Sequence, residues 1–313
     1  MSTSAAHLSA PRAALGAAIV ALLVLAMASP TFAWQSASAH ASLVAREAEA
    51  VPRGTISSAQ GRQAASAPID SPAEALAAGG RRAPGGKSHT VVRHGIDVSH
   101  WQGRIDWDRV ARSGVRFVVA KATEGTWMVD PMYRRNRTHA QRNGLFFTAY
   151  HYANPSRQPG DAKREADWFL RHARLRGANL LPALDLEEHG GLSARELERW
   201  TFVWMRRVEK RLGVKPMLYT SPGFWSGWVG DTPDLARAGF ETLWVSHWQT
   251  RKPWVPANRW AGAGWTFWQW TERGRVAGIH NFVDRNIYSG PRLQRLTIAG
   301  IRRDGSPETD RKR

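Results

Sequence analysis

Short apolar runs alternate with segments of helical period along most of the chain, from Arg93 to Gly290. This alternation indicates strands joined by helical crossovers, which run parallel in one sheet. About eight strands in roughly 200 residues indicate a compact closed sheet, and weak helical patterns in its later part make it irregular. We predict a single domain of the α/β class, an irregular TIM-like (β/α) barrel. The predicted strands are 95–99, 116–122, 145–153, 180–187, 216–220, 242–248, 265–271 and 283–288, and the main predicted helices are 107–113, 131–143, 161–176 and 193–212.

The fourth predicted strand ends abruptly in acidic residues. Because side chains alternate across a strand, Asp185 and Glu187 point to the same side, about 6–7 Å apart along the backbone. Two carboxylates that project together from a strand end suit acid and base chemistry on a glycosidic bond. The alternative is a strand that simply runs into a solvated acidic turn.

Polar and aromatic residues gather at the carboxyl ends of the other predicted strands as well. In an α/β barrel this face carries the active site, so the bias favours a catalytic function for the Asp185–Glu187 pair. Asp97 and Asp284 are further candidates, although each could instead be a structural acid, Asp97 held by backbone amides and Asp284 by Arg285. The strand-end residues are Asp97, Ser99, Lys121, Glu124, Tyr150, His151, Tyr152, Tyr219, Ser221, Ser246, His247, Trp248, Gln269, Trp270, Asp284 and Asn286.

A metal centre is the less favoured interpretation of the same residues. The chain has no cysteine, and its histidines show neither a His-x-His nor a His-Glu-x-x-His spacing. We therefore predict no metal and no organic cofactor.

Seven short motifs occur in a specific order and together resemble the glycoside hydrolase family 25 lysozymes, the N-acetylmuramidases of bacteria, phages and fungi. The resemblance covers about residues 93–290. The motifs are Asp-Val-Ser-His-Trp-Gln-Gly at 97–103, Lys-Ala-Thr-Glu-Gly at 121–125, Ala-Tyr-His-Tyr-Ala at 149–153, Asp-Leu-Glu at 185–187, Leu-Tyr-Thr-Ser at 218–221, Phe-Trp-Gln-Trp-Thr at 267–271 and Val-Asp-Arg-Asn at 283–286.

The resemblance implies hydrolysis of the β-1,4 bond between N-acetylmuramic acid and N-acetylglucosamine. It implies that Glu187 is the general acid and that Asp185 orients the acetamido group of the substrate, which attacks the anomeric carbon. Asp97 and Asp284 would complete an acidic floor. The residues expected to bind substrate are Tyr150, Tyr152, Lys121, Trp248, Gln269 and Trp270, and Trp268 is a further candidate for stacking on a sugar.

The ends of the chain differ in composition from its centre. Residues 1–33 resemble an export signal, with His7 and Arg12 before an uncharged apolar stretch and small residues near Ala33. Residues 34–92 resemble a basic linker rich in Ala, Ser and Gly, and residues 291–313 a basic polar tail. We predict a secreted protein, cell-wall associated or extracellular, with no stable membrane anchor after cleavage of the signal.

The formal net charge of +18 favours a polyanionic neighbour. Export makes nucleic acid an unsuitable partner, so the expected partners are bacterial peptidoglycan and anionic wall polymers. Two alternatives stay open: a wall-binding module that has lost catalysis, which would be expected to have a changed acid at Asp185 or Glu187, and a metal-dependent hydrolase that uses Asp97, His100 and His247.

The basic linker and tail predict salt-sensitive attachment to anionic walls, since exposed charges are screened by salt. The full chain should lose wall binding with added salt more steeply than a fragment of residues 93–290. Sedimentation with purified walls at increasing salt measures this, and equal salt dependence of the two proteins would contradict it.

Overall fold

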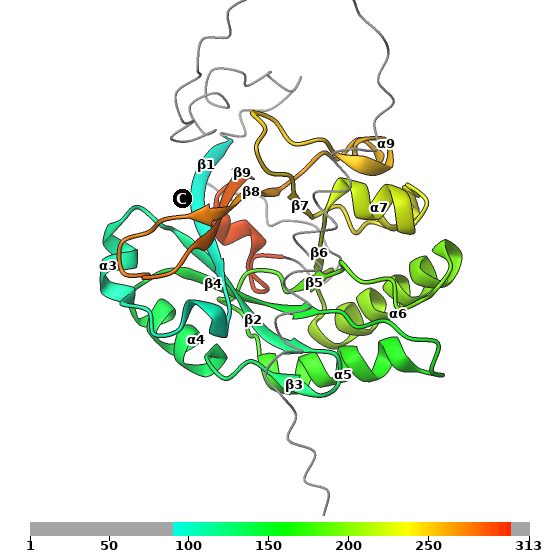
Figure 1. Ribbon diagram of the computed structural model, residues 1–313, viewed down its shortest axis with the longest axis horizontal. Coiled ribbons are helices and arrows are strands. Elements are labelled where there is room, and N and C mark those ends of the chain that lie inside the picture. The colour runs from blue at the N-terminus through cyan, green and yellow to red at the C-terminus, as the bar shows by residue number, and fades with distance from the viewer. Residues whose placement is uncertain (1–89, 302–313) are drawn as a thin grey trace, which may run out of the picture. The chain divides into compact units, whose positions relative to one another are not determined.

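The computed structural model describes residues 90–301 (Figure 1). The predicted signal at 1–33, nearly all of the predicted linker, and residues 302–313 of the predicted tail lie outside the described residues. Between 90 and 301, no helix is long and apolar enough to span a bilayer.

Eight strands form a closed barrel, which confirms the predicted fold class. The order around the barrel is β1-β9-β8-β7-β6-β5-β4-β2, and the parallel pairing of β2 with β1 closes the ring. A short additional strand, β3, extends β2 as an antiparallel partner. The strands are β1 (Val91–Val98), β2 (Phe117–Glu124), β3 (Met128–Val129), β4 (Phe146–Tyr152), β5 (Ala183–Asp185), β6 (Met217–Thr220), β7 (Leu243–Ser246), β8 (Phe267–Gly274) and β9 (Val283–Gly290).

One strand departs from the predicted parallel arrangement. β9 runs antiparallel to both of its neighbours, β8 and β1. The eight residues between Gly274 and Val283 are too few for the helical crossover that a parallel strand requires, so β8 returns directly as a hairpin. In Figure 1 the orange β8 and β9 therefore lie beside the cyan β1 with no helix between them.

Helices cover the outside of the barrel (Figure 1). The long α6 begins with the capping box that the sequence predicts: the Glu196 carboxylate accepts hydrogen bonds from the Ser193 amide at 2.8 Å and the Ser193 hydroxyl at 2.7 Å. α5 ends at Ala173, three residues earlier than predicted, because Arg174 takes a left-handed conformation. The helices are α3 (Trp107–Arg112), α4 (Tyr133–Arg142), α5 (Asp161–Ala173), α6 (Ala194–Leu212), α7 (Pro222–Trp228), α8 (Asp234–Arg237) and α9 (Pro256–Ala261), with 3-10 turns η1 (His100–Gln102) and η2 (Leu293–Leu296).

The alternation of side chains along the strands divides the core into two layers. On each strand, every second residue packs between the strands and the helices, as Ile96 and Val98 do on β1, and we call these positions the outer parity. The residues that alternate with them fill the barrel interior and are called the inner parity. Gly95 belongs to the inner set, and a Cβ atom there would lie 2.4 Å from the ring of Phe117, so only glycine fits. The inner layer contains Phe117, Val119, Leu180, Ala183, Met217, Tyr219, Trp244, Phe267, Tyr288 and Leu293.

The ordered chain continues beyond the predicted domain end at Gly290. Leu293 of η2 joins the inner layer, and Leu296 accepts a hydrogen bond from the amide of Leu181 at 3.0 Å. Since Leu181 precedes β5, this segment covers the amino-terminal end of the barrel. The opposite end remains available for a functional site.

Candidate active site

Asp185 and Glu187 lie together at the carboxyl end of β5 and share a hydrogen bond. They belong to the inner parity, so both project toward the barrel axis as the sequence predicts. Asp185 is 7% exposed, whereas Glu187 is half-buried. A hydrogen bond between two carboxyl groups requires one proton on the pair, so the two groups titrate together.

Asp97 of β1 lies among the same inward-facing residues and is held by two amides. Gln269 of β8 donates to both carboxylate oxygens at 3.2 and 3.1 Å, and Asn286 of β9 donates to Oδ2 at 2.6 Å. Asp284 is the β-sheet partner of Asp97 and also hydrogen-bonds to it. The acids of β1, β5 and β9 thus form one electrostatically coupled cluster.

Burial makes these carboxyl groups hard to ionise. It raises the pKa of Asp97 to about 6, although the hydrogen bonds from Asn286 and Gln269 favour the charged form. Burial also raises the pKa of Asp185 well above its usual range, and the negative charge of Glu187 raises it further. The pKa of Asp284 is raised first by burial and then by the charge of Asp97. The cluster therefore retains protons at a pH where ordinary carboxyl groups have lost them.

A second set of side chains fixes the amides that hold Asp97. The carbonyl oxygen of Gln269 accepts from the Tyr219 hydroxyl at 2.9 Å and from the Trp248 indole at 3.0 Å. The Trp244 indole donates to the Asn286 carbonyl oxygen at 2.7 Å. The sequence placed Asn286 among the strand-end residues without a role, whereas Trp244 was not predicted at all. The inner parity of Trp244 on its strand was the signal that could have found it.

Lys121 brings a positive charge to the cluster, where it lowers the pKa of Asp185 against the larger effect of burial. Its ammonium group lies 2.5 Å from Glu124 and 4.7 Å from the centre of the Tyr152 ring. The Tyr152 hydroxyl donates to Glu188 at 3.2 Å, and Tyr150 packs edge-on against Trp244. These three side chains, all predicted to bind substrate, line the wall that β2 and β4 form.

Two tryptophans that were predicted to contact substrate, Trp268 and Trp270, have the outer parity of β8 and lie outside the site. Trp268 is fully buried among the helices and donates to the His247 carbonyl oxygen at 2.8 Å. Trp270 also packs against the outer layer, with the Arg285 guanidinium 5.2 Å from its ring centre. Both alternate with the inward-facing Gln269, so they point away from the acids.

His151 also has the outer parity of its strand, so its side chain points away from the acids. Its ring stacks on Trp204 of α6, and its two nitrogens contact Thr123 and Glu165, each at 2.8 Å. His151 therefore ties β4, and with it Tyr150 and Tyr152, to the surrounding layer.

The residues of the metal-dependent alternative do not come together. His100 pairs with Asp130 at 2.8 Å, and the ring nitrogen of His247 accepts from the Trp254 amide at 2.9 Å. In the part of the chain that the structure describes, no three His, Cys, Asp or Glu side chains form a group that could hold a metal ion.

Comparisons of the sequence and of the structure with known proteins agree with one another. Residues 96–279 match the family model described as Glycosyl hydrolases family 25. The uncharacterized protein YegX of Escherichia coli K12 is 40% identical over 212 residues, which cover 65% of this chain and 71% of YegX. Lysozyme M1 of Streptomyces globisporus is 34% identical over 223 residues, covering 68% of this chain and 74% of that protein. The crystal structure of the bacterial lysozyme from Streptomyces coelicolor is similar with a TM-score of 0.59 and 32% identity, covering 66% of this chain and 97% of that chain.

The Asp97–Asn286 hydrogen bond predicts a pH-dependent loss of stability in Asn286→Ala. Because the folded pKa of Asp97 is raised, its contribution to stability falls as pH rises from about 4 to about 6. Removing a donor to the charged form raises that pKa further. We expect a loss of about 1–3 kcal/mol in unfolding free energy at about pH 4.5, and a larger loss at pH 7.

Asn179→Ala is the matched control, since Asn179 is buried and its side chain, within residues 90–301, is hydrogen-bonded to backbone groups of Arg176 and Phe147 and to no acid. The loss in unfolding free energy caused by Asn179→Ala should be the same at both pH values. Denaturant unfolding at the two pH values measures both variants, and a pH-independent cost for Asn286→Ala would contradict the assigned role.

Proposed function

The chain belongs to the glycosyl hydrolases family 25, and on that premise we propose that it is a secreted muramidase. Its substrate would be bacterial peptidoglycan, and the bond cleaved would be the β-1,4 bond between N-acetylmuramic acid and N-acetylglucosamine. The observation that carries this proposal is the hydrogen-bonded Asp185–Glu187 pair in a cluster of buried acids at the catalytic end of a barrel.

Glu187 would act as the general acid that protonates the leaving oxygen. The pair needs one proton, and Glu187 is its more accessible member, so a bound sugar can reach it more readily than Asp185. As the glycosidic bond breaks, the proton passes from the carboxyl group to the leaving oxygen and the pair becomes fully ionised. The positive charge of Lys121 favours this ionised state.

Asp185 would orient and polarise the acetamido group of the substrate. The carbonyl oxygen of that group would attack the anomeric carbon, as in the substrate-assisted glycosidases. One oxygen of Asp185, Oδ1, is buried without a hydrogen-bond partner within residues 90–301, which suits a role in accepting the acetamido N–H. Asp97 and Asp284 would support the pair and position water.

Substrate binding is proposed for Tyr150, Tyr152, Lys121 and Trp248, which border the acids. Gln269 is better described as a support, because its amide is fully engaged with Asp97, Tyr219 and Trp248. Trp270 is left out of the proposed site because of its outward parity. No metal or organic cofactor enters the mechanism.

The proposed organisation outside the barrel follows from the sequence. A signal at 1–33 would direct export, the basic linker before β1 and the tail after residue 301 would add attachment to anionic wall polymers, and no membrane anchor would remain. The alternative of a binding module without catalysis is disfavoured because both Asp185 and Glu187 are present.

Substitution of the paired acids tests the proposed roles. Glu187→Gln should lower turnover on peptidoglycan by about 100-fold or more, because the leaving oxygen loses its proton donor, and should leave folding intact. Asp185→Asn should also reduce turnover severely, since a neutral amide polarises the acetamido group less. The release of reducing ends from purified peptidoglycan measures both rates.

Glu188→Gln is the matched control, because this adjacent acid is exposed and accepts a hydrogen bond from the Tyr152 hydroxyl. It should retain most of the wild-type rate. Near wild-type turnover in Glu187→Gln would refute its role as the acid, and full activity in Asp185→Asn would refute substrate assistance.

A further inference from the structure

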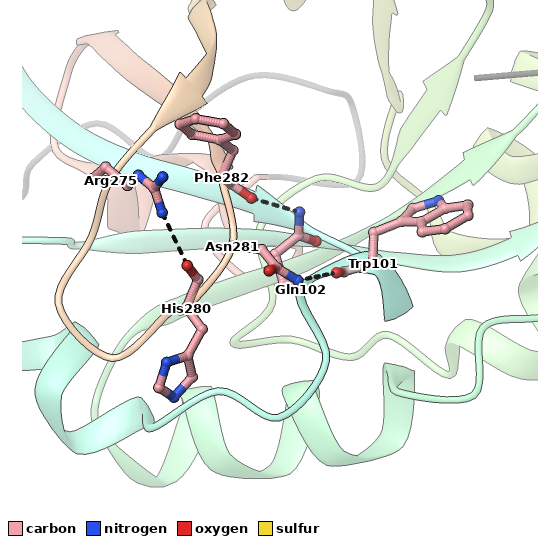
Figure 2. A pocket seen from close by; sticks show the side chains of 6 residues that line it. All are labelled: Trp101, Gln102, Arg275, His280, Asn281 and Phe282. Carbon is pink, nitrogen blue, oxygen red and sulfur yellow. Dashed lines mark hydrogen bonds between the residues drawn. The ribbon is translucent and has the colours of Figure 1, made fainter. Parts of the chain in front are cut away.

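An open pocket of about 470 Å³ lies between the 3-10 turn η1 that follows β1 and the hairpin that joins β8 to β9. Figure 2 shows the Trp101 indole at one end, Arg275 and Phe282 at the other, and two side-chain amides between them. It is lined by Trp101, Gln102, Arg275, His280, Asn281 and Phe282.

Two hydrogen bonds join the walls of the pocket. Gln102 donates from its side-chain amide to the Phe282 carbonyl oxygen at 3.2 Å, and Asn281 donates to the Trp101 carbonyl oxygen at 3.0 Å. These contacts connect residues 180 positions apart in the sequence. The amide oxygen of Gln102 is fixed in turn by the Ser99 amide at 2.9 Å. The pocket is therefore preorganised, which lowers the entropy cost of binding a ligand there.

The two rings of the pocket expose large apolar surfaces to solvent. Trp101 is 59% exposed and Phe282 is 44% exposed. A single exposed aromatic residue needs no special explanation, but two that flank a pocket with polar groups are typical of a binding site. Flat indole faces pack well against the apolar faces of sugars.

The Phe282 end of the pocket is positively charged. The Arg275 guanidinium lies 4.1 Å from the centre of the Phe282 ring, and that of Arg273 lies 5.6 Å from it. Arg275 donates to the His280 carbonyl oxygen at 3.0 Å, and neither arginine forms an ion pair with any acid among residues 90–301. A guanidinium placed in this way can bind a carboxylate with two parallel hydrogen bonds.

We propose that this pocket is an accessory site for an acidic saccharide, which stacks one sugar on Trp101 and places a carboxylate on Arg275. The chemistry fits a muramyl residue whose lactyl carboxylate carries no peptide, in a part of the glycan strand that is not cleaved. The choice of this ligand rests on the proposed function. Trp101 follows Asp97 by four residues and Phe282 precedes Asp284 by two, so a strand bound at the acids lies within about 15 Å of the pocket.

Binding to a peptide-free glycan prepared from peptidoglycan, whose lactyl carboxylates are free, tests the proposal. The full chain would carry Glu187→Gln to prevent cleavage, and calorimetric titration would give the dissociation constant. In this background Trp101→Ala should weaken binding about tenfold and Arg275→Gln about fivefold. Trp101→Phe and Arg275→Lys, which retain a ring and a charge, should recover part of the loss.

Arg211→Gln is the matched control, because Arg211 is an exposed arginine on α6, outside the pocket. It should not change binding. A chitin oligosaccharide, which has the same sugar backbone without lactyl groups, should bind more weakly than the acidic glycan and should not respond to Arg275→Gln. Equal binding of both saccharides, or unchanged binding in Trp101→Ala and Arg275→Gln, would overturn the proposal.

Kinetics with an active enzyme separate the pocket from the reaction centre. In Trp101→Ala the half-saturating concentration of polymeric peptidoglycan should rise, with little change in the rate at saturation. If the saturated rate falls as far as the affinity, Trp101 acts in the reaction and the accessory role is wrong. If the unsubstituted chain cleaves no peptidoglycan but Trp101→Ala and Arg275→Gln still weaken binding of the acidic glycan, the proposed function is wrong and the proposed saccharide site is supported.

Discussion

The structure depends on the burial of several carboxyl groups at one end of a barrel. An isolated ionised carboxylate in an apolar interior costs several kcal/mol, so each acid must be neutralised or hydrogen-bonded. Asp97 receives three hydrogen bonds from Gln269 and Asn286, and Asp185 shares a bond with Glu187. The network raises the proton affinity of the whole cluster, and it requires the strands β1, β5, β8 and β9 to keep their register.

The residues that stabilise the barrel interior and the residues of the candidate active site lie at opposite ends of the barrel axis. At the amino-terminal end, the inner layer is apolar and the segment after β9 covers it, with Leu293 and Leu180 in the same apolar layer. At the carboxyl end, the same inner parity carries acids, amides and tyrosines. Because the period of a strand is two, the residues between these polar positions pack against the helices. The inner positions can therefore carry the site while the outer positions hold the barrel together.

Much of this arrangement was predictable from the sequence, because the apolar runs marked every barrel strand and the carboxyl ends of β1 and β5 marked the acids on them. Asp284 lies instead at the amino end of the antiparallel β9. The direction of β9 was not predicted, since the alternation alone does not distinguish a crossover from a hairpin. Trp270 was placed in the site because it lies near the carboxyl end of its predicted strand, but its neighbour Gln269 has the inner parity. The support of Asp97 by Asn286 and Trp244 joins residues far apart in the chain, which a local pattern cannot reveal.

The identity of the new reducing ends tests the central claim most directly. Purified peptidoglycan would be digested with the full chain, and the sugars at the new ends identified by reduction and mass spectrometry. The account predicts N-acetylmuramic acid at the new ends, and none above background with Glu187→Gln. Ends of N-acetylglucosamine would contradict the proposed specificity, and the absence of new ends from a correctly folded chain would contradict the proposed catalytic function.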